Sequence, residues 1–264
     1  MRHLRSAGHA VLPTDIRTSA ATDIVRCDLR SDADVASLFQ QGPFSTVVHL
    51  AGVLPTAFRS DPLTGADVNL SGTVRLLRAS TAFRVARFVF GSSSSVYGNS
   101  PRPPCSETSA PSPGDPYGAA KLAIETLLEQ LCESHAIRAV SLRIARVLGP
   151  GSTSTGSPWR SQIFEHPFRT GAQLTIPFAS DAVLSAIHVD DLARVLRALV
   201  EAPMPSSNLY NAPVEHVTAE QITPLAEARG WQVALGESYG GPEVDGTRFF
   251  EEFGFATRPL EAPG

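Results

Sequence analysis

The feature that most constrains the fold is a regular alternation of short apolar segments with segments of helix length. Five apolar segments are expected to form buried strands: "HAVLP" (9–13), "TDIVRC" (22–27), "STVVHL" (45–50), "ARFVFG" (86–91) and "IRAVSLRI" (137–144). Helices are expected between them, at about 33–41, 63–82 and 117–134. Strands that alternate with helices favour parallel pairing through crossover connections. The sequence therefore predicts an α/β, Rossmann-like doubly wound parallel sheet.

The pattern changes after residue 145. A Gly/Ser/Pro loop at 149–159 is followed by an expected strand "QLTIPF" and an expected helix at 190–202. Shorter and more mixed elements follow, including a helix near 218–229 and the segment "GTRFFEEFG". We expect a Rossmann-like dinucleotide-binding domain over residues 1–145 and about 182–212. A smaller substrate-binding lobe is expected over about 146–181 and 213–264.

Composition excludes several classes of protein. The 264 residues are 42% hydrophobic and 18% charged, with a net charge of -4, which is typical of a globular domain. No basic patch suggests nucleic-acid binding, and no apolar run is long enough to span a bilayer. Three cysteines (Cys27, Cys105 and Cys132) at unrelated spacings argue against a disulfide framework. The reduced cytoplasm is the expected location.

The stretch "DPYGAAKLAIETLLEQL" (115–131) carries the first candidate chemistry. Asp115 is a suitable N-cap and Pro116 suits the first helical position, so Tyr117 and Lys121 fall one turn apart on one helix face. This spacing has an ordinary alternative, a polar stripe that faces water. The stripe would consist of Lys121, Glu125, Glu129 and Glu133.

A serine cluster earlier in the chain favours a catalytic interpretation of that helix. "FVFGSSSSVYG" (88–98) is an expected strand that ends in four serines, and serines there are often plain turn residues. In a parallel sheet, however, ligands bind beyond the carboxyl ends of the strands. A phenol with its ordinary pKa near ~10 moves protons poorly at neutral pH, and a nearby ammonium favours the phenolate. A hydroxyl, a phenol and an ammonium together predict a site that interconverts alcohol and carbonyl.

The chain resembles the extended short-chain dehydrogenase/reductases, in particular their NAD-dependent epimerase/dehydratase branch. The matching stretches lie within residues 8–200: "TDIR", "CDLR", "VVHLAGV", "VNLSGTVRLLRA", "FVFGSSSSVYG", "PYGAAK", "LRIARVLGPG" and "IHVDDLARVL". The resemblance implies that Ser93 is the active serine and Tyr117 the general acid/base, with Ser94 nearest to Ser93 as a competitor. Lys121 would favour the phenolate of Tyr117 and hold the nicotinamide ribose.

The same resemblance implies residues that bind NAD. Asp15 stands where an acid would hold the adenosine ribose hydroxyls, which favours NAD over NADP although Arg17 lies nearby. The other implied cofactor residues are Asp28, Leu29, Leu50, Ala51 and Gly52. Asn69 resembles the helix asparagine that supports the active site. For Asp15 and Asp28 the alternative is an acid in a turn or a helix cap.

The chain departs from the family at its N-terminus. The family begins with a strand and a glycine-rich loop that holds the pyrophosphate at a helix N-terminus. "MRHLRSAGHAVLPTD" instead matches the end of the first helix and the second strand, so about 20 residues would be absent. The missing strand would lie between the strands at 9–13 and 45–50. We expect either a truncated chain or wrongly assigned start, or a natural remnant that binds NAD weakly or not at all.

The substrate is less defined than the cofactor. Leu184 and Ser185 stand where sugar-nucleotide members of the family often carry an arginine and an aspartate, and Arg146 replaces an asparagine. A smaller polyol, a hydroxy acid or another carbonyl compound is therefore favoured, with Arg146 in the substrate site. Arg146 and Arg160 could meet a carboxylate or could lie on the surface. We assign no metal, because aspartates at a helix start explain the segment "HVDD" (188–191) better.

The sequence thus predicts a cytoplasmic NAD-dependent oxidoreductase that transfers a hydride to or from a hydroxyl-bearing carbon of a small molecule. The alternative is a catalytically impaired remnant, or a regulatory binding protein without cofactor. The family resemblance also implies a homodimer that forms through the helices at 63–82 and 117–134.

Overall fold

The computed structural model describes residues 1–18, 23–98, 104–134, 137–151, 156–169, 171–203 and 205–260. The chain divides into two compact units, and each is described by itself. Unit 1 consists of Met1–Val96, Pro113–Arg143 and Leu196–Tyr210. Unit 2 consists of Tyr97–Ser112, Ile144–Val195 and Asn211–Gly264.

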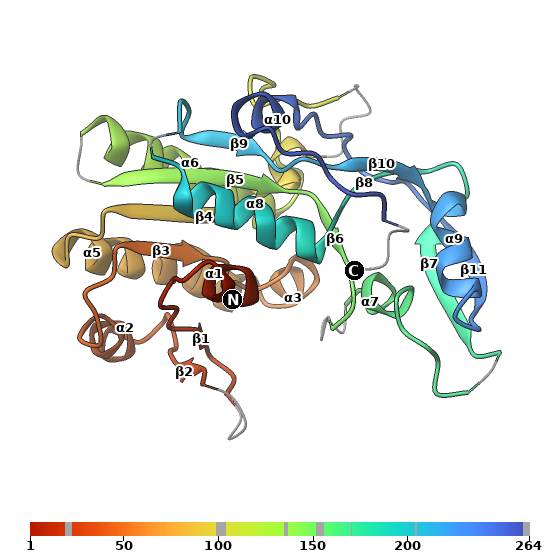
Figure 1. Cartoon of the computed structure of the whole chain (residues 1–264), viewed down its shortest axis with the longest axis horizontal. Coiled ribbons are helices and arrows are strands. Elements are labelled where there is room, and N and C mark those ends of the chain that lie inside the picture. The colour runs from red at the N-terminus through yellow and green to blue at the C-terminus, as the bar shows by residue number, and fades with distance from the viewer. Residues whose placement is uncertain are drawn as a thin grey trace. The chain divides into compact units, whose positions relative to one another are not determined.

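Unit 1 is built on a four-stranded sheet in the order β3-β4-β5-β9 (Figure 1). Its strands are β3 (Thr46–His49), β4 (Arg87–Ser93), β5 (Arg138–Ile144) and β9 (Leu209–Asn211). β3 and β4 pair in parallel, with Thr46 opposite Arg87. The strands predicted at 45–50, 86–91 and 137–144 are confirmed, and so is the α/β class with parallel strands.

The N-terminal strands form a separate sheet. β1 (Thr14–Asp15) and β2 (Val25–Arg26) pair in parallel with each other, whereas β3 stands at one end of the four-stranded sheet. The strand predicted over 9–13 is wrong. The strand begins later, at Thr14: the carbonyl of Pro13 accepts a hydrogen bond of 2.9 Å from the N–H of Val25, and the paired residues start at Thr14.

Unit 1 has helices at the three predicted positions, about 33–41, 63–82 and 117–134, and a further helix, α3, that was not predicted. They are α1 (Arg2–Ser6), α2 (Asp32–Phe39), α3 (Pro55–Ser60), α4 (Pro62–Ala66), α5 (Thr73–Ala82) and α6 (Pro116–Glu133). The helix predicted at 63–82 contains a π-helical turn, η1 (Asp67–Gly72), between α4 and α5. A π-turn inserted in a helix often marks a functional position, and this turn contains Asn69.

Helices cover both faces of the four-stranded sheet (Figure 1). On one face, Phe88 and Phe90 of β4 pack in a core with residues of α5 and α6, such as Leu76 and Ile124. The intervening Val89 is fully buried on the other face, because side chains alternate along a strand. There Arg87 donates hydrogen bonds to carbonyls at the end of α8 (Val189–Glu201).

Unit 2 contains two small sheets. Its strands are β6 (Arg146–Leu148), β7 (Gln173–Phe178), β8 (Val183–His188), β10 (Glu215–Thr218) and β11 (Gln232–Ser238). β8 pairs in parallel with β6 and antiparallel with β10, and β7 pairs in parallel with β11. The helices are α7 (Trp159–Gln162), α9 (Ala219–Glu227) and α10 (Thr247–Phe253). The strand "QLTIPF" is confirmed at its predicted bounds.

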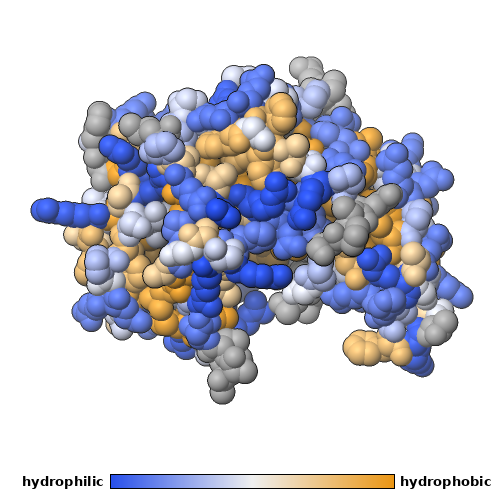
Figure 2. All heavy atoms as spheres, viewed as in Figure 1, coloured by the Kyte–Doolittle hydropathy of each residue, from blue (hydrophilic) through white to orange (hydrophobic). Residues whose placement is uncertain are grey.

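Polar and apolar residues are mixed on the surface that Figure 2 shows. Among the residues that the structure describes, no helix has both the length and the apolar character needed to cross a membrane. A few large apolar side chains are exposed, among them Leu63, which is 85% exposed at the start of α4.

Candidate active site

The site is built around the first turn of α6. Asp115 caps this helix, because its Oδ1 accepts a hydrogen bond of 2.8 Å from the backbone N–H of Gly118, and Pro116 occupies the first turn. The predicted cap is therefore confirmed. The cap fixes where the helix begins and places Tyr117 in its first turn.

The serines after β4 form a tight turn. β4 runs through Ser93, and a 3-10 turn, η2 (Ser94–Tyr97), follows directly. The Oγ of Ser93 accepts a hydrogen bond from the backbone N–H of Ser95 and donates one to the Oγ of Ser95, each at 3.1 Å. Ser93 is buried and Ser94 is partly exposed. These bonds hold the Ser93 hydroxyl in a defined position at the end of the strand.

Helix α6 packs directly on this serine turn. A Cβ atom added to Gly118 would lie only 2.5 Å from the carbonyl oxygen of Ser95, so no larger residue fits without movement. Gly118 thus permits close contact between the first turn of α6 and the backbone two residues after Ser93. The two segments predicted to share the site are brought together here.

Lys121 anchors the same helix to β4 from inside the protein. Its side chain is 6% exposed, and its Nζ donates a hydrogen bond of 2.7 Å to the carbonyl of Gly91. The Nζ lies 4.7 Å from the centre of the Phe90 ring and 5.7 Å from the centre of the Tyr117 ring. Lys121 therefore does not belong to a solvent-facing stripe.

Burial changes the proton affinity of Lys121. Removal of the ammonium from water lowers its pKa to about 8, and the carboxylate of Glu125 opposes this shift. Burial also lowers the pKa of His49 to about 3, with a smaller contribution from the charge of Lys121. His49 is thus neutral at physiological pH, and Lys121 is a cation with a proton that it can lose in mild alkali.

The sequence did not reveal a buried ionic cluster beside Lys121. Arg143 on β5 donates to both oxygens of Glu125, with Nη2 at 2.7 Å from Oε2, and the hydroxyl of Ser92 also donates to Glu125. All three side chains are buried. The predicted polar stripe therefore divides: Lys121 and Glu125 face the interior, and Glu129 and Glu133 face water. The spacing of the stripe could not show that Arg143 would approach from another element.

The Tyr117 ring is held from the other side by α3. Phe58 packs edge-on against it, with ring centres 6.4 Å apart, and Tyr117 is 9% exposed. The Tyr117 ring thus packs in an apolar cluster with Phe58 and Ala120, and the Lys121 ammonium lies 5.7 Å from the ring centre. In such surroundings an ammonium acts more strongly on a neighbouring phenolate than it would in water.

Asn69 organises the loop that follows β3. Its Oδ1 accepts a hydrogen bond of 2.7 Å from the N–H of Val53, and its Nδ2 donates one of 2.9 Å to the carbonyl of the same residue. Thr73 donates to the Asn69 carbonyl and lies 2.9 Å from Nε2 of His49. Gly52 lies against Asn69, since an added Cβ would be 3.0 Å from Oδ1. Asn69 therefore sets the path of residues 50–53.

The candidate cofactor residues differ in exposure. Leu50, Ala51 and Gly52 are exposed, and the Asp15 side chain is 45% exposed. The Arg30 guanidinium binds both oxygens of Asp28 and lowers the pKa of that carboxyl to about 2.

Leu29 packs in the core of unit 1. Its Cβ lies 2.9 Å from the position that a Cβ on Gly72 would occupy, so it lies against the end of η1. Asp28 and Leu29 thus have roles within the fold in addition to the adenine contact predicted for them.

The predicted substrate residues are Ser94, beside Ser93, and Arg146 in unit 2. Arg146 on β6 donates a hydrogen bond of 3.1 Å to the carbonyl of Gly240, and its guanidinium lies over the Phe178 ring. Leu184 is fully buried in the core. The Ser185 hydroxyl accepts a hydrogen bond of 3.0 Å from the N–H of Val244. These two positions are used for packing and for loop attachment.

The acids after β8 bind arginines. Asp191 is fully buried and accepts hydrogen bonds from Arg194 and Arg258, with distances of 2.7 to 2.9 Å. Burial opposes ionisation, but these bonds outweigh it and lower the pKa of Asp191. In the part of the chain that the structure describes, no group of three or more His, Cys, Asp or Glu is arranged to hold a metal ion.

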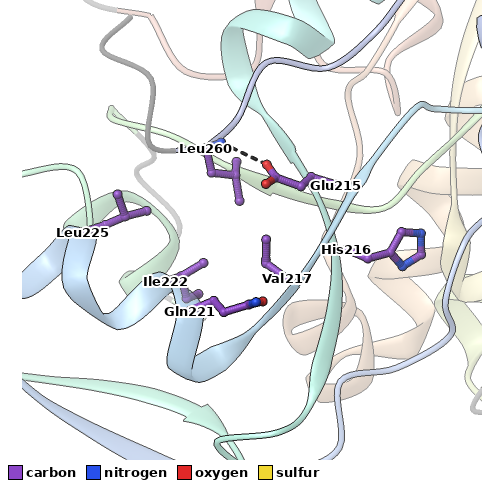
Figure 3. Close-up of a pocket in the computed structure, with 7 residues that line it drawn as sticks. All are labelled: Glu215, His216, Val217, Gln221, Ile222, Leu225 and Leu260. Carbon is purple, nitrogen blue, oxygen red and sulfur yellow. Dashed lines mark hydrogen bonds between the residues drawn. The ribbon is translucent and has the colours of Figure 1, made fainter.

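A separate pocket of about 210 Å³ lies in unit 2 between β10 and α9 (Figure 3). Its lining residues are Glu215, His216, Val217, Gln221, Ile222, Leu225 and Leu260. Glu215 accepts a hydrogen bond of 2.9 Å from the backbone N–H of Leu260, which attaches the C-terminal segment here. None of the candidate residues lines this pocket.

These features define an α/β protein with a Rossmann-like unit in which a tyrosine and a lysine, one helical turn apart, adjoin a serine turn. The model of the NAD dependent epimerase/dehydratase family matches residues 1–212. The chain belongs to this family.

Curated relatives include UDP-glucose 4-epimerases. The enzyme from Lacticaseibacillus casei is 32% identical over 124 residues, which are 46% of this chain and 37% of that protein. The enzyme from Bos taurus is 33% identical over 156 residues, which are 56% of this chain and 44% of that protein. The matched segments thus span less than half the length of these relatives.

Solved structures have the same fold over nearly the whole chain. The UDP-glucose 4-epimerase of Thermus thermophilus in complex with NAD is 24% identical, with a TM-score of 0.79, and covers 95% of this chain and 87% of that chain. A GalE-like L-threonine dehydrogenase from Cupriavidus necator is 18% identical, with a TM-score of 0.83 and coverages of 98% and 90%. MoeE5 in complex with UDP-glucuronic acid and NAD is 26% identical, with a TM-score of 0.81 and coverages of 98% and 89%.

Proposed function

We propose that this protein is an NAD-dependent oxidoreductase of the epimerase/dehydratase type. It would transfer a hydride to or from a hydroxyl-bearing carbon of a sugar, a polyol or a hydroxy acid. The observation that carries the proposal is the position of Lys121. It is buried one helical turn after Tyr117 and donates a hydrogen bond to the carbonyl of Gly91, the residue of β4 directly before the serines. Family membership and the similarity to NAD complexes support the choice of cofactor.

The residues present fit two parts of NAD. Asp15 is exposed enough to accept the adenosine ribose hydroxyls, and the exposed backbone at Ala51 and Gly52 leaves room for the dinucleotide. Lys121 would hold the nicotinamide ribose. We assign no residue to the pyrophosphate, because the sequence has no Gly-x-x-Gly-x-x-Gly segment. NAD supplies the hydride acceptor, and the steps below concern the side chains of this chain.

Three side chains would handle the proton. The phenol of Tyr117 would take the proton from the substrate hydroxyl as its carbon loses hydride, and return it in the reverse direction. The Lys121 ammonium would stabilise the phenolate in the apolar surroundings formed with Phe58. Ser93 would hold the substrate oxygen by a hydrogen bond, and Asn69 would keep the adjoining loop in place. Oxidation, epimerisation and dehydration all begin with this step.

The experiment measures conversion of UDP-sugars, polyols and hydroxy acids in the presence of NAD. Oxidation is followed by the absorbance of NADH, and epimers and dehydration products, which form without net NAD reduction, by chromatography. Tyr117→Phe is expected to lower turnover by at least about 10³-fold, because the proton then has no carrier, while the circular dichroism spectrum stays unchanged. Tyr239→Phe is the matched control, since Tyr239 is 57% exposed and lies outside the candidate site. Full activity of Tyr117→Phe would refute the catalytic assignment.

A second candidate function is a binding or regulatory protein without catalysis. It differs from the first candidate in its affinity for NAD, which a glycine-rich loop at a helix N-terminus usually provides in dinucleotide-binding proteins. Such a protein would keep the buried Tyr117 and Lys121 as structural residues only. No NAD reduction with any substrate, together with no NAD binding, would support this alternative.

We also propose that the protein is a cytoplasmic homodimer. Leu63, at the start of the helical segment predicted to form the interface, is 85% exposed and would be covered by a partner. A reducing compartment suits a chain whose three cysteines, Cys27, Cys105 and Cys132, lie at unrelated spacings. Sedimentation velocity on the purified protein tests the dimer.

A further inference from the structure

Three buried polar side chains of unit 1, Ser92, Glu125 and Arg143, have no part in the proposed reaction. The Arg143 guanidinium donates to both oxygens of Glu125, with Nη2 2.7 Å from Oε2 and Nε 3.1 Å from Oε1, and the Ser92 hydroxyl donates to the same carboxylate. Removing an ion pair from water is unfavourable, and apolar residues of similar volume often stabilise a fold as well or better. An ion pair at this position therefore points to a role beyond packing.

The ion pair adjoins Lys121 along both the helix and the strand. Glu125 lies one helical turn after Lys121 on α6, and both side chains are buried. Nζ of Lys121 donates to the carbonyl of Gly91, and the next residue of β4, Ser92, donates to Glu125. The ammonium and the carboxylate therefore lie against consecutive residues of one strand.

Lys121 is a buried cation that depends on this carboxylate at a distance. Its Nζ donates to a backbone carbonyl, and among the residues that the structure describes no carboxylate lies within 4.0 Å of it. Burial lowers the pKa of Lys121 to about 8, and the charge of Glu125 opposes this shift. Of the other titratable and charged groups near Lys121, Tyr117 is on the same helix, and Arg143 of β5 is bound to Glu125. His49 of β3 has a pKa lowered by burial to about 3 and is neutral.

We propose that Glu125 is a positioning residue for the reaction: held by Arg143 and Ser92, its carboxylate keeps Lys121 in the ammonium form beside Tyr117. An ammonium stabilises a phenolate, whereas a neutral amine does not. Without the carboxylate, more of Lys121 would be neutral near pH 7, and Tyr117 would take the substrate proton less readily. The inference deepens the proposed function and rests on it in one respect, that Tyr117 carries the proton.

The experiment measures the protonation of Lys121 directly. Lys121 is the only lysine in the sequence, so the full chain produced with lysine labelled by carbon-13 at the ε-carbon gives a single side-chain signal. This signal is followed by NMR from about pH 6 to about pH 10.5, without substrate or cofactor. We expect Glu125→Gln to titrate at a midpoint at least about 0.5 below that of the wild type. Glu125→Asp, which keeps the charge, should fall between the two.

The controls separate the carboxylate from its surroundings. Glu129→Gln is the matched control, because Glu129 lies one turn further along α6 and faces water, and it should titrate like the wild type. The double variant Glu125→Gln/Arg143→Gln leaves no unpaired charge in the interior and should also titrate below the wild type. It provides the test by itself if Glu125→Gln does not fold. A double variant with the wild-type midpoint would assign the effect to the unpaired Arg143 and overturn the inference.

Turnover gives a second readout, which a merely structural role would not move. The proposed reaction needs the Lys121 ammonium, so turnover should fall as the pH rises through the pKa of Lys121. In Glu125→Gln this loss should occur at lower pH, by the same interval as the NMR midpoint. An unchanged NMR midpoint in folded Glu125→Gln overturns the inference, and so does an unchanged pH profile in an active variant. A chain without turnover whose midpoint still shifts refutes the proposed function alone, and the effect of Glu125 on Lys121 stands.

Discussion

The surroundings of Lys121 indicate whether this site is catalytic or only stabilises the fold. Lys121 is buried although other residues of α6 face water. Its ammonium donates a hydrogen bond to the Gly91 carbonyl and lies beside two aromatic rings. Removing an ammonium from water is unfavourable, so other interactions of the fold must offset the free energy of burying Lys121. A lysine kept in this way next to a tyrosine is typical of a catalytic site.

The first prediction concerns stability and pH. The folded chain holds the Lys121 proton with a pKa of about 8, against 10.5 for the ordinary side chain. Between these values the unfolded chain binds more protons than the folded chain, so the free energy of unfolding should rise with pH. The gain is on the order of 3 kcal/mol, fully present only above about pH 10.5.

Chemical denaturation of wild type and Lys121→Met from pH 7 to pH 10.5 checks this prediction. The comparison isolates Lys121 from other groups that titrate in this range, such as the thiols. Relative to Lys121→Met, the wild type should become more stable as the pH rises. A difference that stays constant over the range would show that Lys121 keeps its ordinary pKa.

The position of an individual residue was predictable from sequence where all the residues that determine it lie in one short segment. Asp115, Tyr117 and Lys121 lie in one helix turn or two, and the structure has the cap and the buried lysine that this segment suggests. Arg143 was not predictable as a partner of Glu125, because the two residues lie on different elements and only the packing of α6 on the sheet joins them.

At the scale of elements, α6 is joined to the end of β4 at three levels along its length. Gly118 packs on the backbone of Ser95, Lys121 binds the Gly91 carbonyl, and Glu125 binds Ser92. Each contact lies about one turn of helix from the next. The position of the Tyr117 phenol relative to the serines therefore depends on the close contact at Gly118.

The second prediction tests this close contact. Gly118→Ala places a methyl group 2.5 Å from the Ser95 carbonyl and should move the start of α6 away from the serine turn. We expect at least about 10-fold lower turnover and about 1–3 kcal/mol lower stability, the usual range for overpacking. Gly114→Ala is the control, because an added methyl group there meets nothing within 4 Å. Equal turnover of the two variants would contradict the account.

The third prediction concerns the ionic cluster under α6. Glu125→Gln leaves the Arg143 guanidinium buried without its carboxylate, so we expect the variant to lose about 3–5 kcal/mol of stability. Glu129→Gln, one turn further along the same helix and exposed to water, should change stability by less than about 0.5 kcal/mol. Urea denaturation compares the two variants. Similar midpoints would mean that the pair contributes little.

The elements themselves were largely predictable, because apolar strands and amphipathic helices have different periods. The π-turn at Asp67–Gly72 and the loss of a strand at 9–13 were not. Both depend on partners outside the segment itself: Asn69 binds the loop at Val53, and pairing with β2 begins at the end of the predicted strand, with Pro13 and Thr14.

At the scale of the whole molecule, the described residues of unit 1 form a two-stranded sheet, β1-β2, and a four-stranded sheet, β3-β4-β5-β9. β3 ends the four-stranded sheet, and β1 and β2 pair only with each other. In the proposed function, NAD would contact this chain through the Asp15 region, the loop at 50–52 and Lys121. The affinity of the chain for NAD thus measures how much of the cofactor site these residues provide.

Calorimetric titration of NAD into the wild type and into Lys121→Met tests the central claim most directly. The account predicts binding to the wild type with a Kd in the micromolar range, and binding at least about 10-fold weaker to Lys121→Met, because the ammonium holds the nicotinamide ribose. Absence of any binding to the wild type, or equal binding to both proteins, would contradict it.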